Sequence, residues 1–388
     1  MNNKSLKVVY LTPALYMAGG VERVLTLKAN YFADHFGYDV TIVLTDGKDK
    51  PLFYPLSEKI KVVNLDINFE ELWTCSFIKK IWIYLKKQRT YRRLLTAELM
   101  HLRPDITVSL MRREVNFIND IKDGSRKVGE LHVNRAHYRN FESANSNWLK
   151  HWFSKFWMRR LLDDVRRLDR LVVLTAKDRE AWAELDHVVD IPNPLTFEPQ
   201  TVSQLSEKRV IAVGRYCYEK GYDLLLQAWA KVAAQHPDWR LDVFGDGDRT
   251  PYEQQRAALG LSEDSCRLHG RTSDIEKEYL ASSLLVCSSR FEGFGMMLVE
   301  AMACGLPVVS FDCQWGPRSI IADGQDGLLV ADGDVDKLAE GLSRLMTDAS
   351  LRQQMGQAAR ENVKRFRIDA IAARWQALFN EVCNSEKN

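Results

Sequence analysis

The sequence predicts an α/β protein made of two doubly wound parallel sheets with helices on both faces. Short aliphatic and β-branched runs alternate with helical patterns throughout, which is typical of βαβ units. The alternation breaks at residues 191–208, where three prolines precede a polar stretch. The chain of 388 residues is also too long for one average core. We therefore expect two domains, over residues 1–192 and 193–366.

The first domain contains six expected strands, most of them continuous apolar runs. Such runs are typical of parallel strands that are buried on both faces. They are KVVYLT (7–12), DVTIVLT (39–45), KVVNLD (61–66), DITVSL (105–110), KVGELH (127–132) and RLVVLT (170–175).

The second domain contains five more expected strands. In doubly wound sheets ligands bind beyond the carboxyl ends of the strands, so we expect a ligand cleft between the two domains at such ends. The strands are RVIAVGR (209–215), RLDVFGDG (240–247), SLLVCSS (283–289), PVVSFDC (307–313) and GLLV (327–330).

Charge is unevenly distributed along the chain. The net charge is +2, but residues 1–192 carry +8 and residues 193–388 carry −6, so the first domain is the one expected to meet an acidic surface or substrate.

Seven scattered cysteines without a CxxC pair indicate reduced thiols and a cytoplasmic protein. No apolar run approaches the length of a membrane span. No nucleic-acid partner is expected.

The segment RFEGFGMMLVEAMACGLP (290–307) places two glutamates, Glu292 and Glu300, eight residues apart. We expect a strand to end at 289 and a helix to run over 296–304, with a glycine-rich loop between them. A helix that starts in such a loop can bind an anion with its free N–H groups. The two carboxylates would then accept hydrogen bonds from hydroxyls on opposite sides of a phosphate group. A sugar nucleotide is a ligand with hydroxyls on both sides of a phosphate. The alternative is a turn residue and a solvated helix residue.

Two further loops follow expected strands. GRYCYEKG (214–221) contains Arg215 and Lys220, and an arginine fork with a lysine point charge suits a diphosphate. The alternative is two surface cations. AGGVERV places Gly19 and Gly20 before a helix, but it is not the GxGxxG fingerprint of dinucleotide-binding proteins.

These motifs resemble those of the GT-B glycosyltransferases of family 4, which are retaining enzymes, and the similarity runs over nearly the whole chain. EGFGMMLVEAMACGLPVV resembles the E-x7-E motif of that family, GRYCYEKGYDLLLQAW resembles its diphosphate-binding loop, and GGVERV resembles its N-terminal glycine loop. The first two motifs are specific. The resemblance implies two Rossmann-like domains facing a central cleft, with the last helix, at 367–388, crossing back onto the first domain.

The resemblance also implies roles for the motif residues. Glu292 would contact the ring hydroxyls of the donor sugar, and Glu300 the ribose hydroxyls. Arg215 and Lys220 would hold the diphosphate and stabilise the charge that develops on it as it leaves. No carboxylate would act as a covalent nucleophile, because the leaving diphosphate itself helps to take the proton of the acceptor.

Other positions match less specific parts of the family pattern. His132 would hydrogen-bond the transferred sugar near the reacting carbon, although a packed structural histidine is the alternative. Arg271 would meet the base through its main chain. Ser319 stands where the family commonly has Glu, and neither Ser319 nor Arg318 receives a role. The remaining donor-binding positions are Gly19, Gly20, Phe294, Gly295, Met296 and Met297.

The expected activity is transfer of a hexose or N-acetylhexosamine from a nucleotide diphosphate sugar, with UDP as the favoured nucleotide. The acceptor would be a saccharide, lipid-linked, in assembly of a surface polysaccharide such as lipopolysaccharide. We expect no metal, because DGD (246–248) and DGDVD (332–336) are typical of turns and a helix N-cap. The alternatives are a nucleotide-sugar epimerase or hydrolase, a dinucleotide-binding oxidoreductase, and a non-catalytic scaffold at a membrane surface.

Two basic segments indicate contact with an anionic membrane. Residues 79–93 and 148–161 combine lysines and arginines with apolar and aromatic side chains at helical spacing. The alternative is that each stripe packs on the sheet. If the membrane hypothesis holds, the protein is peripheral on the inner face of the plasma membrane.

Overall fold

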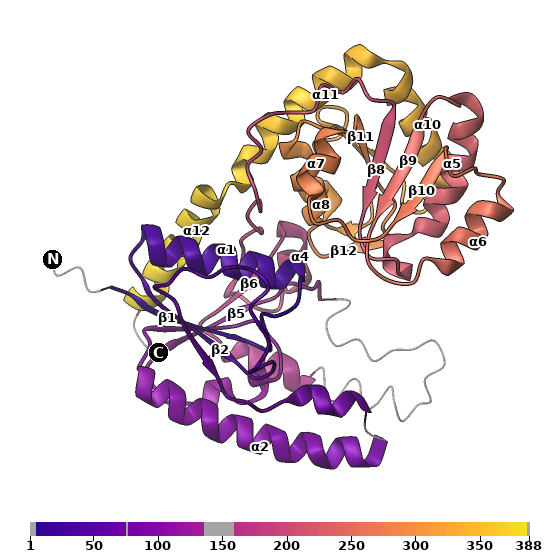
Figure 1. The fold of residues 1–388 in the computed structure, drawn as a ribbon. Helices are drawn as coiled ribbons and strands as arrows, with labels where there is room; N and C mark the ends of the chain where they lie inside the picture. The colour runs from indigo at the N-terminus through magenta and orange to yellow at the C-terminus, as the bar shows by residue number, and fades with distance from the viewer. Residues whose placement is uncertain (1–4, 75–76, 136–158, 386–388) are drawn as a thin grey trace. The chain divides into compact units, whose positions relative to one another are not determined.

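A computed structural model describes residues 5–74, 77–135 and 159–385. It divides the chain into two compact units (Figure 1). Unit 1 is Met1–Pro194 with Ile368–Asn388, and unit 2 is Leu195–Arg367. The sequence predicted the two breaks after residues 192 and 366.

Unit 1 is built on a seven-stranded sheet in the order β3-β2-β1-β4-β5-β6-β7. Every neighbouring pair of strands is parallel. The strands are β1 (Lys7–Thr12), β2 (Asp39–Leu44), β3 (Lys61–Asn64), β4 (Ile106–Ser109), β5 (Arg126–Glu130), β6 (Arg170–Val173) and β7 (Val188–Asp190).

Helices cover both faces of this sheet. Val8 and Tyr10 of β1 pack into one core with α1 and α12, whereas Val9 and Leu11 pack into a second core with α2. This alternation follows from the two-residue period of a strand. Figure 1 shows α1 and α12 side by side. The helical elements are α1 (Gly20–His35), η1 (Phe69–Thr74), α2 (Phe77–Leu102), η2 (Glu114–Asn116), η3 (Ile118–Asp120), α4 (Ala176–Ala181) and α12 (Ile368–Asn384).

Unit 2 has a six-stranded parallel sheet in the order β10-β9-β8-β11-β13-β15. A separate short parallel pair joins β12 (Phe291–Glu292) to β14 (Gln314–Trp315). The six strands are β8 (Arg209–Val213), β9 (Arg240–Phe244), β10 (Cys266–His269), β11 (Leu284–Cys287), β13 (Val308–Phe311) and β15 (Gly327–Val330).

The helices of unit 2 cover its sheet, and α5 and α10 share a hydrophobic core with β8, β9 and β13. The predicted helix over 296–304 is present as α8, which ends one residue earlier. The helical elements are η4 (Tyr218–Lys220), α5 (Tyr222–Gln235), α6 (Thr250–Ala258), α7 (Ile275–Leu280), α8 (Met296–Ala303), α9 (Pro317–Ile320), α10 (Val335–Thr347), α11 (Ala349–Asn362) and η5 (Val363–Phe366).

Both sheets are doubly wound, so the predicted fold class is confirmed. In each sheet the strand order reverses beside the first strand, between β1 and β4 in unit 1 and between β8 and β11 in unit 2. Ligands of such folds bind at this switch point, outside the carboxyl ends of the strands. The loops that follow β8 and β11 are 214–221 and 288–295, which carry the two specific motifs of the sequence.

Candidate active site

An ion pair joins the two loops at the switch point of unit 2. Lys220 ends η4, and its Nζ donates to Oε1 of Glu292 at 2.6 Å. Burial would lower the pKa of Lys220, but the carboxylate of Glu292 outweighs burial and holds that pKa above its ordinary value. Gly221 follows with a φ of 61°, and a Cβ there would collide with the carbonyl oxygen of Ser288. The two loops therefore approach each other backbone to backbone.

Glu292 is held as a buried, hydrogen-bonded carboxylate. It is 9% exposed, and the hydroxyl of Ser289 donates to the same oxygen as Lys220, at 2.6 Å. A buried carboxylate needs such donors, because an unpaired buried charge is costly. The alternative of a plain turn residue is therefore wrong, because Glu292 lies in β12 and is buried and paired.

Arg290 clamps the two loops together. Its guanidinium donates to the carbonyl oxygen of Tyr218 at 2.8 Å and to both carboxylate oxygens of Asp223, at 2.8 and 2.6 Å. Ser288 adds a hydrogen bond from its hydroxyl to the carbonyl oxygen of Lys220, at 2.9 Å. Sequence reasoning missed these residues, although Arg290 stands two positions before the first glutamate of the motif.

Glu300 lies in α8 with two neighbours on its carboxylate. It is 7% exposed, so it is not a solvated helix residue. The Thr196 hydroxyl donates to Oε1 at 2.6 Å, and the Tyr279 hydroxyl to Oε2 at 3.3 Å. Sequence reasoning missed both partners, because each lies more than twenty residues from Glu300 along the chain.

The N-terminus of α8 separates the two glutamates. Gly295 is its N-cap, with a φ of 98°, and Met296 and Met297 begin the helix. The N–H of Leu298 donates to the carbonyl oxygen of Gly295 at 2.9 Å, but the N–H groups before it have no acceptor within the helix. The positive end of the helix dipole adds to these donors. The loop therefore presents backbone donors between Glu292 and Glu300, as an anionic group of a ligand requires.

Comparison with known proteins identifies the class of this unit. Residues 196–362 match the family of glycosyl transferases group 1. The match contains every predicted site residue of unit 2, including Arg215, Lys220, Glu292 and Glu300.

Similar proteins extend the comparison over the rest of the chain. An uncharacterized glycosyltransferase of Haemophilus influenzae is 28% identical over 96% of this chain and 99% of its own length. The amylovoran biosynthesis glycosyltransferase AmsD of Erwinia amylovora is 24% identical over 96% of this chain and 99% of its own length. The exopolysaccharide phosphotransferase SCO2592 of Streptomyces coelicolor is 38% identical over 225 residues, but the chain spans only 24% of its length.

Solved structures place the fold. Sucrose-phosphate synthase from Thermosynechococcus elongatus superposes with a TM-score of 0.79 at 18% identity, covering 97% of this chain and 99% of that one. A TarM variant of S. aureus in complex with UDP superposes with a TM-score of 0.74 at 17% identity, covering 97% and 100%. The fold is GT-B, as the sequence predicted, and the comparisons together support a GT-B glycosyltransferase.

The other predicted residues of this glycosyltransferase lie at strand ends as well. Arg215 is an exposed residue in the loop after β8, and Arg271 is exposed two residues after β10. In unit 1, Gly19 is the N-cap of α1 and Gly20 is its first residue. His132 lies two residues after β5. Among the predicted site residues, Lys220 and Glu292 are thus a pair in direct contact, through their side-chain hydrogen bond of 2.6 Å.

His132 belongs to a buried charge network in unit 1. Its side chain is 5% exposed, and its Nε2 lies 3.1 Å from Oε1 of Glu130. Glu130 also forms a buried ion pair with Lys28 of α1, whose ammonium lies 4.3 Å from the ring centroid of Trp375 in α12. Burial would raise the pKa of Glu130, but Lys28 and His132 lower it to about 2. The sequence signal was an acidic residue, Glu130, inside the predicted strand KVGELH.

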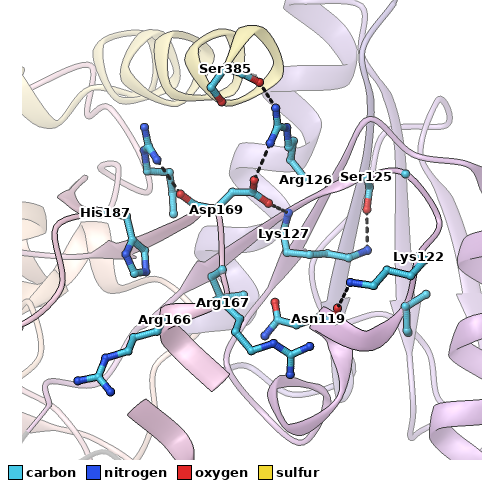
Figure 2. A pocket seen from close by; sticks show the side chains of 14 residues that line it. Asn119, Lys122, Ser125, Arg126, Lys127, Arg166, Arg167, Asp169, His187 and Ser385 are labelled. Atoms are coloured by element: carbon cyan, nitrogen blue, oxygen red, sulfur yellow. Dashed lines mark hydrogen bonds and ion pairs between the residues drawn. The ribbon is translucent and has the colours of Figure 1, made fainter. Parts of the chain in front are cut away.

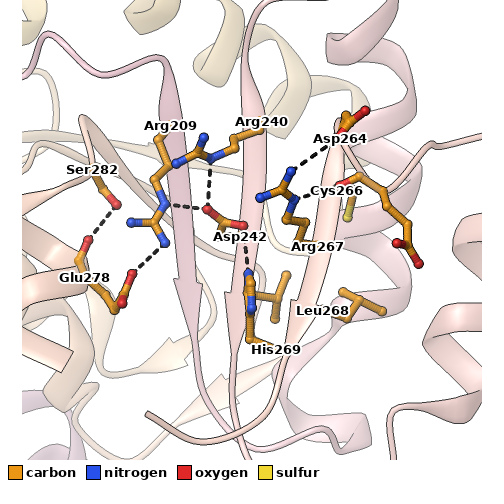
Figure 3. A network of polar contacts seen from close by, with 12 residues as sticks. Arg209, Arg240, Asp242, Asp264, Cys266, Arg267, Leu268, His269, Glu278 and Ser282 are labelled. Atoms are coloured by element: carbon orange, nitrogen blue, oxygen red, sulfur yellow. Dashed lines mark hydrogen bonds and ion pairs between the residues drawn. The ribbon is translucent and has the colours of Figure 1, made fainter. Parts of the chain in front are cut away.

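A second network fixes the end of β10 (Figure 3). Asp242 of β9 is buried, and it accepts hydrogen bonds from the Arg209 guanidinium and from Nε2 of His269, the latter at 2.8 Å. Arg209 also donates to Glu278 of α7 at 2.7 Å. The network holds the strand that leads directly to Arg271.

A cavity of about 770 Å³ lies at the amino ends of β5, β6 and β7 (Figure 2). The Arg126 guanidinium on its wall lies 3.0 Å from Asp169, and that of Arg167 lies 2.6 Å from Asp120. Because these cations already have counter-charges and the cavity lies at the edge opposite the usual ligand edge, we assign it a structural role. The cations that line it are Lys122, Arg126, Lys127, Arg166, Arg167 and Arg170.

The two aspartate-rich segments form turns and caps. Asp334 caps α10 by accepting from the N–H of Lys337 at 2.9 Å, so the predicted N-cap is confirmed. Asp248 accepts from the N–H of Thr250 at 3.0 Å, directly before α6. Over the described ranges, the structure has no group of three or more histidine, cysteine or acidic side chains arranged to hold a metal ion.

The basic helix predicted at 79–93 is part of α2, and it exposes apolar side chains. Trp82 is 67% exposed and Leu85 is 53% exposed, with the ammonium of Lys86 lying 5.7 Å from the Trp82 ring centroid. Most of the second basic segment, 148–161, lies outside the described residues. No helix in the part of the chain that the structure describes is long and apolar enough to cross a bilayer.

Proposed function

We propose that this GT-B glycosyltransferase belongs to family 4 and transfers a hexose or N-acetylhexosamine from a UDP-sugar with retention of anomeric configuration. The observation that carries the proposal is the Lys220–Glu292 ion pair at the switch point of unit 2, beside the N-terminus of α8. A cation, backbone donors and a carboxylate together fit a diphosphate that carries a hydroxyl-rich sugar.

The proposed chemistry divides these groups by role. Lys220, Arg215 and the N–H groups that begin α8 stabilise the charge that develops on the leaving diphosphate. Glu292 accepts hydrogen bonds from the ring hydroxyls of the sugar, and Glu300 from those of the ribose. The leaving diphosphate helps to take the proton of the acceptor hydroxyl. No covalent carboxylate intermediate and no metal ion are required in this scheme.

UDP is the nucleotide favoured by the comparisons, since TarM, a protein of the same fold, was solved with UDP. The test is thermal unfolding of the full chain in the presence of UDP, GDP, ADP, NAD and UDP-sugars. A ligand at a hundred times its dissociation constant adds about 2.7 kcal/mol to the stability of the folded state. We expect the unfolding temperature to rise with UDP and UDP-sugars. If NAD alone raises the unfolding temperature, or if none of these ligands raises it, the proposed donor site is contradicted.

We also propose that the acceptor is lipid-linked and that α2 lies against an anionic membrane. An exposed tryptophan and leucine among cations are typical of helices that lie in the bilayer interface. The excess of positive charge in residues 1–192 supports the same orientation toward an acidic surface.

Exchange of both Trp82 and Leu85 for glutamine is expected to abolish most membrane binding. The wild-type protein should co-sediment with phosphatidylglycerol vesicles but not with phosphatidylcholine vesicles, and high salt should release it. The matched control is Met100→Gln, which removes an exposed apolar side chain near the other end of α2. Equal sedimentation of the double variant and the wild type would exclude this surface.

A further inference from the structure

The Glu300 carboxylate is held from both sides by side chains that the proposed chemistry does not use. Thr196 donates to one oxygen at 2.6 Å, and Tyr279 faces the other at 3.3 Å. We infer that Thr196 and Tyr279 are positioning residues, which orient the Glu300 carboxylate toward the ribose hydroxyls of the bound nucleotide. This inference rests on the proposed donor site.

The chemistry of a carboxylate allows both sets of bonds at once. An ionised carboxylate accepts about four hydrogen bonds, two on each oxygen. Thr196 and Tyr279 approach different oxygens, so each oxygen of Glu300 receives a hydroxyl donor from the protein. The vicinal 2′- and 3′-hydroxyls of a ribose are a pair of donors whose hydrogen bonds a carboxylate can accept with its two oxygens.

Both donors are themselves fixed by the fold of unit 2. Tyr279 of α7 is fully buried, and burial raises the pKa of its hydroxyl well above the ordinary value, so the hydroxyl stays protonated and able to donate. Thr196 follows Leu195, whose N–H donates to the carbonyl oxygen of Phe366 at 2.7 Å. This backbone bond pins the start of unit 2, and Thr196 with it, to the segment that ends η5.

A purely structural role for Thr196 makes a different prediction. In that case the hydroxyl only compensates a buried carboxylate, and its loss would weaken the folded state and all ligands alike. A positioning role makes the loss depend on the ribose hydroxyls of the ligand. Comparing UDP with 2′-deoxy-UDP therefore separates the two roles.

The experiment is calorimetric titration of both nucleotides into the wild type and into Thr196→Val, which keeps the shape and removes the donor. We expect the wild type to bind UDP more tightly than 2′-deoxy-UDP, on the order of tenfold. Thr196→Val should lose roughly tenfold in affinity for UDP and little for 2′-deoxy-UDP, and Thr196→Ser should restore the wild-type preference. The exposed Thr347→Val serves as the matched control, without effect on either ligand.

Tyr279→Phe repeats the comparison on the other oxygen, so the test does not depend on one variant folding. Equal losses for both nucleotides in Thr196→Val and Tyr279→Phe would overturn the positioning role while leaving the donor site in place. If the wild type binds UDP but does not distinguish it from 2′-deoxy-UDP, the assignment of Glu300 to the ribose fails and the inference fails with it. If the wild type does not bind UDP at all, the proposed function itself is wrong.

Discussion

Replacing Lys220 by alanine is expected to lower the turnover of sugar transfer at least about a hundredfold. A preorganised donor aimed at developing charge contributes about 3 kcal/mol to the lowering of a reaction barrier. Lys220 is preorganised in this sense, because Glu292 holds its ammonium at 2.6 Å and keeps it charged. An ammonium has three N–H groups, and the bond to Glu292 needs one of them. The ammonium can therefore donate to a diphosphate while it remains hydrogen-bonded to Glu292.

The measurement is the initial rate of transfer from a UDP-sugar, with EDTA present in a parallel series. Lys231→Ala is the control, since Lys231 of α5 is half exposed and pairs with Asp336 at the surface. Thermal unfolding of each variant separates lost chemistry from lost folding, because Lys220→Ala leaves the buried Glu292 without its cation. A loss below tenfold in a folded variant would refute the role, and abolition of wild-type activity by EDTA would refute metal independence.

The sequence predicts those strands whose own residues form an aliphatic, β-branched run. KVVYLT and DVTIVLT are rich in aliphatic and β-branched residues, and both are strands at or within one residue of the predicted bounds. β10 reads CRLH and β7 has three residues, so neither shows a pattern of its own. Such strands form because a neighbouring strand offers a ladder of backbone hydrogen bonds, which the local sequence does not encode.

The candidate site divides in the same way. Short motifs predicted the loops around Lys220 and Glu292, because glycines and charged residues at fixed spacing indicate a ligand-binding loop from neighbouring residues alone. The partners of Glu300 could not be predicted, since Thr196 lies 104 residues away and is joined to Glu300 only by the fold. The burial that keeps these carboxylates paired is likewise a property of tertiary packing.

Replacing Glu130 by glutamine is expected to destabilise unit 1 by about 3 to 5 kcal/mol, the usual cost of removing one partner from a buried ion pair. Lys28 would remain in the core against Trp375 with no counter-charge from Glu130. Burial already lowers the pKa of Lys28, and loss of the carboxylate would lower it further. The folded variant then binds fewer protons than the unfolded chain, so its stability rises with pH. The deficit relative to wild type should therefore shrink from pH 7 toward pH 10.

Urea unfolding followed by tryptophan fluorescence at pH 7 and pH 10 measures this deficit. Two controls separate the buried pair from charge removal in general. Glu340→Gln removes the acid of an exposed pair with Lys337 and should cost less than about 1 kcal/mol. The double variant Lys28→Met with Glu130→Leu should recover most of the loss, because apolar side chains of similar volume often replace a buried ion pair without cost. A Glu130→Gln deficit as small as that of Glu340→Gln would mean that the Lys28–Glu130 pair does not stabilise the folded state.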